Sequence, residues 1–183
     1  MILPIDLYGN SILRKESEEI TADYPDLKQL IDNMFETMYN ADGIGLAAPQ
    51  IGLAIRLLVI DLAPLGEENP ELAQFKKVMI NPIMLEVSEE ELIGSEGCLS
   101  IPGISKDVPR SQWIKIQYYD ENFKLHVEEF KDFKARVIQH EYDHIEGILF
   151  TDRIKPLRRQ MIKSKLNNIA KRKVDCKYKV ARN

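Results

Sequence analysis

The amino-acid sequence predicts a mixed α+β fold, in which antiparallel sheets pack around a central helix and a further helix lies at the C-terminus. Residues 113–119 and 124–130 have strand character and flank the turn-forming triplet 120–122, which is typical of an antiparallel hairpin. The chain has 183 residues, 44% hydrophobic and 30% charged, which suits one globular domain. Three other segments have helical character: 27–38, 132–144 and 156–170.

The first helix is predicted by apolar residues at helical spacing between Leu27 and Met38, which form one face. Asp23 or Asp26 is expected to cap the start of this helix. The pair Asp42–Gly43 is expected to end it.

Three short strands are expected between the first helix and the hairpin. Residues 56–61 and 75–81 are strand-like, and Pro82 should stop the second of them. Residues 83–87 predict a third strand. Residues 62–71 are rich in Pro, Gly, Glu and Asn and predict a surface loop.

The central helix is expected from Asp132 to His144, with Gly147 as its C-terminal stop. The last helix is expected from Pro156 to Ala170, because proline is favoured in the first turn of a helix. Its apolar residues predict one stripe, formed by Leu157, Met161, Ile162, Leu166 and Ile169.

Charge is distributed unevenly along the chain. The net charge is −4, but residues 153–183 hold twelve Lys and Arg and a single acid, Asp175. Residues 1–152 are correspondingly acidic. Such a basic segment indicates either an anionic partner or a solvated helix that favours Lys and Arg, and charge alone does not separate the two.

Composition also excludes several classes of protein. Apolar runs are short, as in Leu57–Ile60, so no membrane span is predicted. The N-terminal residues lack the basic region of a secretory signal. With two cysteines, Cys98 and Cys176, a disulfide framework is excluded and a reducing cytosol is the expected compartment.

The strongest chemical signal is the run His140-Glu141-x-x-His144. Residues four apart lie on one face of a helix, so both imidazoles can reach one divalent cation, with Glu141 placed to move a proton. A surface helix with two ordinary histidines is the alternative, because so short a motif also arises by chance.

A catalytic site of this kind needs a third protein ligand. Phe150 stands where one class of peptidase has a third histidine, and no Glu follows Glu146. Cys98 in Ser95–Ser100 is a candidate upstream, because a thiolate suits a borderline-soft ion; a small buried hydrophobe is the alternative. The downstream candidates are Asp152, Asp175 and Cys176.

A third unusual segment runs from Gly43 to Gly52. Its small residues allow close approach of the backbone, and the Gln50 amide could donate to a developing oxyanion. The glycine spacing fits no nucleotide-binding loop. Taken alone, the segment favours a tightly packed structural turn.

Together the three segments resemble the peptide deformylases. That family has a Gly-Φ-Gly-Φ-Ala-Ala-x-Gln stretch (here Gly43 to Gln50), a Glu-Gly-Cys-Φ-Ser stretch (Glu96 to Ser100) and a Gln-His-Glu-Φ-Asp-His stretch (Gln139 to His144). The resemblance extends to the layout, with strands on either side of the Cys segment. It implies a catalytic domain over 1–152, and over 153–183 a basic helix and tail attached to the same domain.

The resemblance implies an enzyme that removes the N-formyl group from the N-terminal methionine of nascent polypeptides. Cys98, His140 and His144 would hold one divalent metal ion, Fe²⁺ in the cell, with Zn²⁺, Ni²⁺ or Co²⁺ in purified protein. Glu141 would be the general base. The Gln50 side chain and the Leu99 backbone N–H would stabilise the oxyanion.

The resemblance also suggests how the substrate binds. Backbone groups of Gly45 and Gly97 would pair with it as an added strand. Ile44, Phe133 and Val137 would form the methionine pocket, or else belong to the plain core. Two further roles are expected: Arg110 reaches the substrate backbone or carboxylate, and Asp143 pairs with an arginine or makes a hydrogen bond around the metal ligands that fixes the helix. Arg136 is an unexpectedly polar residue near an apolar pocket.

The expected partners are N-formylmethionyl nascent peptides and, through the basic C-terminal helix, the ribosome, with no sequence-specific nucleic acid and no membrane. The expected location is cytoplasmic. Two alternatives remain at this point: a metallopeptidase on the same helix, and a nucleic-acid or ribosome-associated module with a structural metal, which would need a fourth protein ligand.

Overall fold

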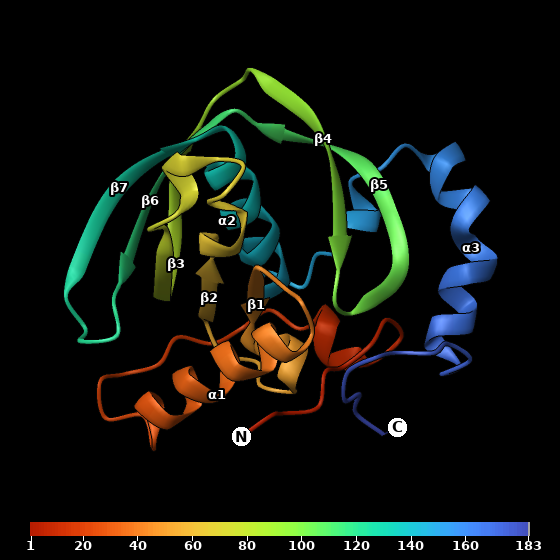
Figure 1. The fold of residues 1–183 in the computed structure, drawn as a ribbon, viewed down its shortest axis with the longest axis horizontal. Coiled ribbons are helices and arrows are strands. Elements are labelled where there is room, and N and C mark those ends of the chain that lie inside the picture. Colours follow the sequence, from red (N-terminus) through yellow and green to blue (C-terminus); the bar gives the residue numbers. More distant parts are fainter. Residues whose placement is uncertain (183) are drawn as a thin grey trace.

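A computed structural model describes residues 1–182 of the chain (Figure 1). Their α-helices are α1 (Leu27–Asn40), α2 (Asp132–Ile145) and α3 (Pro156–Ala170). Their strands are β1 (Gly45–Ala47), β2 (Leu57–Asp61), β3 (Lys76–Val87), β4 (Glu91–Cys98), β5 (Ile101–Ser111), β6 (Trp113–Tyr119) and β7 (Leu125–Lys131).

The strands form two antiparallel sheets. One has five strands in the order β1-β2-β3-β6-β7, and the other is the long hairpin β4–β5. Helix α2 lies between them, with α1 beneath the β1 end of the larger sheet and α3 outside β5 (Figure 1). The predicted α+β fold with antiparallel sheets around a central helix is therefore confirmed.

Strand β2 shows why the core holds α1 and α2 on opposite faces of the sheet. All five of its residues are buried. Leu58 and Ile60 belong to the apolar cluster that contains Ile138 of α2, whereas Leu57 and Val59 belong to the cluster that contains α1. Successive side chains of a strand point to opposite faces. A strand covered on both faces reads as a continuous apolar run, as the sequence indicated.

Helix α3 packs against the body through part of its predicted apolar stripe. Ile162, Leu166 and Ile169 are buried in a third cluster, which also contains Phe150. The prediction is wrong at the start of the stripe, where Leu157 and Met161 are each 76% exposed. The three buried residues are four and three residues apart and so share one face of the helix. Met161 lies roughly 100° around the helix from Ile162 and falls outside that face.

Strand β3 corrects the prediction that Pro82 stops a strand. The strand continues to Val87, and its register with β6 shifts between Ile80 and Ile83. Asn81 has a φ of 50° there, which the short polar side chain of Asn tolerates. Proline fits a strand at such an irregularity, because the ladder hydrogen bond it cannot donate is already interrupted.

The ends of α1 also differ in detail from the prediction. Asp26 is the first flanking residue, but it has a left-handed φ of 52° and its side chain caps no backbone N–H. At the other end Asp42, with φ of 54°, takes the left-handed position, and the N–H of Gly43 donates to the Met38 carbonyl at 2.9 Å. The helix therefore ends at the predicted place with Asp in the conformation that glycine usually takes.

The hairpin β6–β7, the central helix and the last helix lie where the sequence predicted them. Residues 62–71 form a connection with two short 3-10 turns, as expected for a loop. The hairpin β4–β5 agrees with the family layout but has no clear alternation, since glycine interrupts both strands and proline interrupts β5. Within residues 1–182, none of the helices combines the length and apolar character that crossing a membrane demands.

Candidate metal centre

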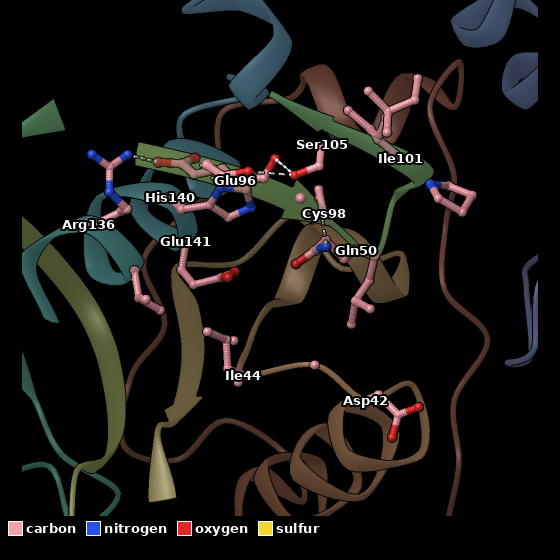
Figure 2. A pocket seen from close by; sticks show the side chains of 18 of the residues that line it. Asp42, Ile44, Gln50, Glu96, Cys98, Ile101, Ser105, Arg136, His140 and Glu141 are labelled. Carbon is pink, nitrogen blue, oxygen red and sulfur yellow. Dashed lines mark hydrogen bonds and ion pairs between the residues drawn. The ribbon is translucent and has the colours of Figure 1, made fainter. Parts of the chain in front are cut away.

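Three side chains that could hold a metal ion converge where α2 meets the end of β4. The Nε2 of His144 lies 3.3 Å from the Sγ of Cys98, and the two histidine rings are 5.2 Å apart at 76°. One ligand atom from each of Cys98, His140 and His144 lies within 4.8 Å of the others. Figure 2 shows Cys98 and His140 turned toward each other, with Glu141 and Gln50 beside them.

A tight turn carries Cys98 to this position. Cys98 pairs with Ile101, so that Leu99 and Ser100 are the two residues of the turn between β4 and β5. The Ser100 carbonyl accepts a hydrogen bond from the backbone N–H of Tyr8 at 2.8 Å. The Cys98 thiol therefore lies at the end of a strand, beside a turn that is held by the N-terminal segment.

The buried carboxylate of Glu96 orients His140. It accepts hydrogen bonds from Arg110 at 2.8 and 2.9 Å, from Arg136 at 2.8 Å and from the Nδ1 of His140 at 2.8 Å. Burial raises the pKa of Glu96, but its bonds to Arg110 and His140 outweigh burial and lower the pKa to about 2. Because Nδ1 is engaged, His140 presents Nε2 to the site.

Asp143 confirms the expectation that it pairs with arginine. Its carboxylate accepts from Arg110 at 2.5 Å and from Arg153 at 2.5 and 2.6 Å. The prediction that Arg110 reaches the substrate is wrong. Only 3% of it is exposed, and its guanidinium lies between Glu96 and Asp143, so it does not reach a substrate.

The contacts of Arg136 explain why this polar residue lies near an apolar cavity. Besides Glu96, its guanidinium donates to the carbonyl oxygens of Leu92 at 2.5 Å and Val108 at 2.8 Å, one on each strand of the hairpin. A Cβ at Gly94 would lie 2.9 Å from this guanidinium, so glycine leaves it room. Arg136 therefore ties α2 to β4 and β5.

The donor set fits a divalent transition metal ion. A thiolate and two imidazoles suit ions such as Fe²⁺ and Zn²⁺ and not Mg²⁺ or Ca²⁺, which prefer oxygen. Burial lowers the pKa of His144 well below its usual value, which favours the neutral imidazole that metal ions bind. Three protein ligands leave a further position open, as in catalytic centres.

Glu141 is buried beside this centre and has the properties of a proton carrier. Its Oε2 finds no hydrogen-bond partner among the described residues. Burial raises the pKa of Glu141 to about 7, so the carboxylate can take up or release a proton near neutral pH. A Cβ at Gly45 would overlap Oε1 of Glu141, so that glycine makes the space for the carboxylate.

Gln50 has one fixed orientation, although it lies on a short 3-10 turn. Its Oε1 accepts from the N–H of Ala47 at 2.9 Å, so its Nε2 is the end that faces the site. Nε2 lies 3.2 Å from the Ser100 Oγ and 3.5 Å from the Cys98 Sγ. The side chain thus presents a donor beside the Cys98 thiol.

A cavity of about 560 Å³ opens over the centre. Ile44, Phe133 and Val137 line it, as do the backbone segments around Gly45 and Gly97. Strand β1 is the edge of its sheet, and β4 pairs with β5 alone, so both strands have an edge free of a partner strand among residues 1–182. Their roles toward a ligand stay predictions.

Sequence reasoning did not single out the side chains of Glu96 and Tyr178, although both line the cavity. Glu96 belongs to the motif around Cys98, which was a signal for it. Tyr178 lines the cavity from the C-terminal tail, and the alternation of apolar and charged residues from Val174 to Val180 indicates an extended segment.

Fold and site together define the class as a metal-dependent hydrolase built on a His-Glu-x-x-His helix. The family model for polypeptide deformylase matches residues 2–160, and the chain belongs to that family. A peptide deformylase of Christiangramia forsetii is 51% identical over 98% of this chain and 95% of its own length. One from Flavobacterium psychrophilum is 54% identical over 98% and 96%.

Solved structures give the same result. The crystal structure of peptide deformylase from Thermus thermophilus has a TM-score of 0.83 and 39% identity, covering 94% of this chain and 99% of that one. A plant peptide deformylase structure has a TM-score of 0.84 and 38% identity, covering 93% and 90%.

Replacing Glu96 by Gln is expected to weaken metal binding by about 10–100-fold, because outer partners of ligating histidines contribute that much. The exposed Glu91 on the same strand supplies the control, Glu91→Gln. Competition with a chelator measures the affinity. Equal affinities for Glu96→Gln and Glu91→Gln would show that Glu96 does not orient His140.

Replacing Gly45 by Ala is expected to displace the Glu141 carboxylate while the protein stays folded, since the added Cβ meets the end of a side chain. We expect kcat to fall about 100-fold, in the range for a displaced general base, with Tm within a few degrees. Asn122→Ala, in the exposed turn between β6 and β7 and away from the cavity, is the control. A fully active Gly45→Ala protein would contradict the claim that Gly45 makes the space for the Glu141 carboxylate.

Proposed function

We propose that this chain removes the N-formyl group from the N-terminal methionine of nascent polypeptides and releases formate, using a divalent ion held by Cys98, His140 and His144. The observation that supports this most is the buried Glu141 next to an open three-ligand centre on the floor of an apolar cavity. A closed structural site would need a fourth protein ligand.

The ion, when bound, supplies Lewis-acid chemistry that acidifies water and polarises a carbonyl oxygen. Glu141 takes the proton from the water that adds to the formyl carbon. The C–N bond then breaks, Glu141 delivers the proton to the leaving amine, and formate departs. A carboxylate with a pKa of about 7 suits both transfers.

Gln50 and Leu99 stabilise the negative charge that develops on the formyl oxygen. The Gln50 Nε2 has a fixed direction because Oε1 is held by Ala47. The Leu99 N–H belongs to the turn that follows the metal ligand Cys98. Losing one donor of this kind typically raises the barrier by about 2.7–4 kcal/mol.

The substrate lies as an added strand between β1 and β4. Backbone groups near Gly45 and Gly97 pair with its main chain, which the free edges of both strands favour. The methionine side chain enters the pocket lined by Ile44, Phe133 and Val137. These apolar residues suit an unbranched thioether.

Fe²⁺ is the ion we assign in the cell, with Zn²⁺, Ni²⁺ or Co²⁺ able to replace it in purified protein. The thiolate and imidazole donors accept all four, so supply decides more than affinity. Both cysteines are free thiols, which accords with the reducing cytoplasm where nascent chains are made.

The basic C-terminal helix is the surface we assign to the ribosome, without recognition of nucleotide sequence. Its exposed Lys and Arg side chains face solvent and can meet RNA phosphates. They include Arg158, Arg159, Lys163, Lys165 and Lys171.

Release of formate from a formyl-methionyl peptide by the anaerobically iron-loaded or nickel-loaded protein tests the activity. We expect turnover that falls about 10²–10⁴-fold in Glu141→Ala, the usual contribution of a general base. The unformylated peptide should stay intact. Cleavage of that peptide would indicate a peptidase, and stoichiometric metal without formate release would contradict the proposal.

Ribosome binding should depend on the charge of α3 and weaken steeply with salt, as phosphate contacts do. Deleting the helix would remove the buried Ile162 and Leu166 and uncover the apolar cluster that they pack against, so we choose the exposed Arg158, Lys163 and Lys165 and replace them together by Gln. Sedimentation with ribosomes at low and high salt measures binding. The charge-matched control replaces three lysines outside α3 by Gln: Lys76, Lys115 and Lys124. Equal binding by both variants would exclude α3 as the ribosome-binding surface.

A further inference from the structure

The chain after α3 returns to the body as an extended segment. Val174, Cys176, Tyr178 and Val180 are half-buried and pack on the third apolar cluster, while the residues between them are exposed. An alternation with a period of two is typical of a strand. The segment therefore presents every second side chain to the body.

Backbone hydrogen bonds to the N-terminal segment hold this tail in register. The N–H of Ile5 donates to the Lys179 carbonyl, and the N–H of Ala181 donates to the Ile5 carbonyl, both at 2.9 Å. Figure 1 shows the two ends of the chain on the same side of the molecule. Tyr178 thus has a defined position next to residues that are distant in sequence.

Tyr178 reaches the turn that carries the metal ligand. Its hydroxyl donates to the Leu99 carbonyl at 2.5 Å, and its side chain lines the cavity. The same turn accepts two other hydrogen bonds, from the Tyr8 N–H to the Ser100 carbonyl and from the Gln50 Nε2 to the Ser100 Oγ. The turn is thus held from the tail, from the N-terminal segment and from Gln50.

We propose that Tyr178 is a positioning residue of the active site, which fixes the Leu99–Ser100 turn so that the Leu99 N–H keeps its direction toward the cavity. The inference rests on the proposed deformylase function. Tyr178 lies beyond residue 160, where the match to the family model ends, so the tail adds this support to the shared catalytic core. The catalytic unit then includes the tail and does not end at residue 152.

The variant Tyr178→Phe tests the inference, because it keeps the ring and removes only the hydroxyl. The control is Lys177→Ala, an exposed neighbour on the same tail. We expect kcat of the nickel-loaded Tyr178→Phe protein to fall about tenfold, the scale of one lost hydrogen bond, with KM changed less than about twofold. Lys177→Ala should match the wild type.

Amide hydrogen exchange of the metal-free protein gives a readout independent of turnover. We expect exchange at Tyr8, whose N–H donates to the Ser100 carbonyl of the turn, to speed up about tenfold in Tyr178→Phe and to stay unchanged in Lys177→Ala. Unchanged exchange with unchanged kcat would overturn the inference, as would a rise in KM alone, which would make Tyr178 only a wall of the cavity.

The two proposals fail in different ways. If the wild type released no formate, the deformylase function would fail, and exchange at the Tyr8 amide would still decide whether Tyr178 holds the turn. If the wild type is active and Tyr178→Phe is equally active with unchanged exchange, only the role of Tyr178 is overturned.

Discussion

The buried carboxylate of Glu96 is the constraint on which the rest of the site depends. A carboxylate removed from water is costly unless several donors replace its hydration. Here Arg110, Arg136 and His140 supply those donors, and they come from β5 and α2. Satisfying this one charge therefore fixes the central helix against the β4–β5 hairpin and at the same time sets the orientation of His140, a predicted metal ligand.

The remaining parts of the site follow from that arrangement. With α2 fixed, His144 and Glu141 take their places from helical spacing, and Cys98 meets them because it lies two residues after Glu96 on β4. The Arg110–Asp143–Arg153 cluster extends the same network to the residues after α2. Because these groups are mutually hydrogen-bonded, the network is more rigid than its separate pairs would be.

The sequence predicted those features of the fold and the site that depend on interactions between residues close together in the chain. The spacing of His140 and His144 and the hairpin at 113–131 were readable because neighbours in sequence create them. The role of Arg110 was wrong, because its partners Glu96 and Asp143 are 14 and 33 residues away and a linear motif does not show such pairing. The predictions for Pro82 and Met161 were wrong for a similar reason. The bulge of β3 against β6 and the face that α3 presents to the body are tertiary features.

A crystal structure of the zinc-loaded protein is the measurement that tests the central claim most directly. The account predicts that Cys98 and the Nε2 atoms of His140 and His144 bind the ion, that the fourth position is open to solvent, and that Nδ1 of His140 keeps its hydrogen bond to Glu96. Ligation by Glu141 as a fourth protein group, or by His140 through Nδ1 with the bond to Glu96 broken, would contradict it.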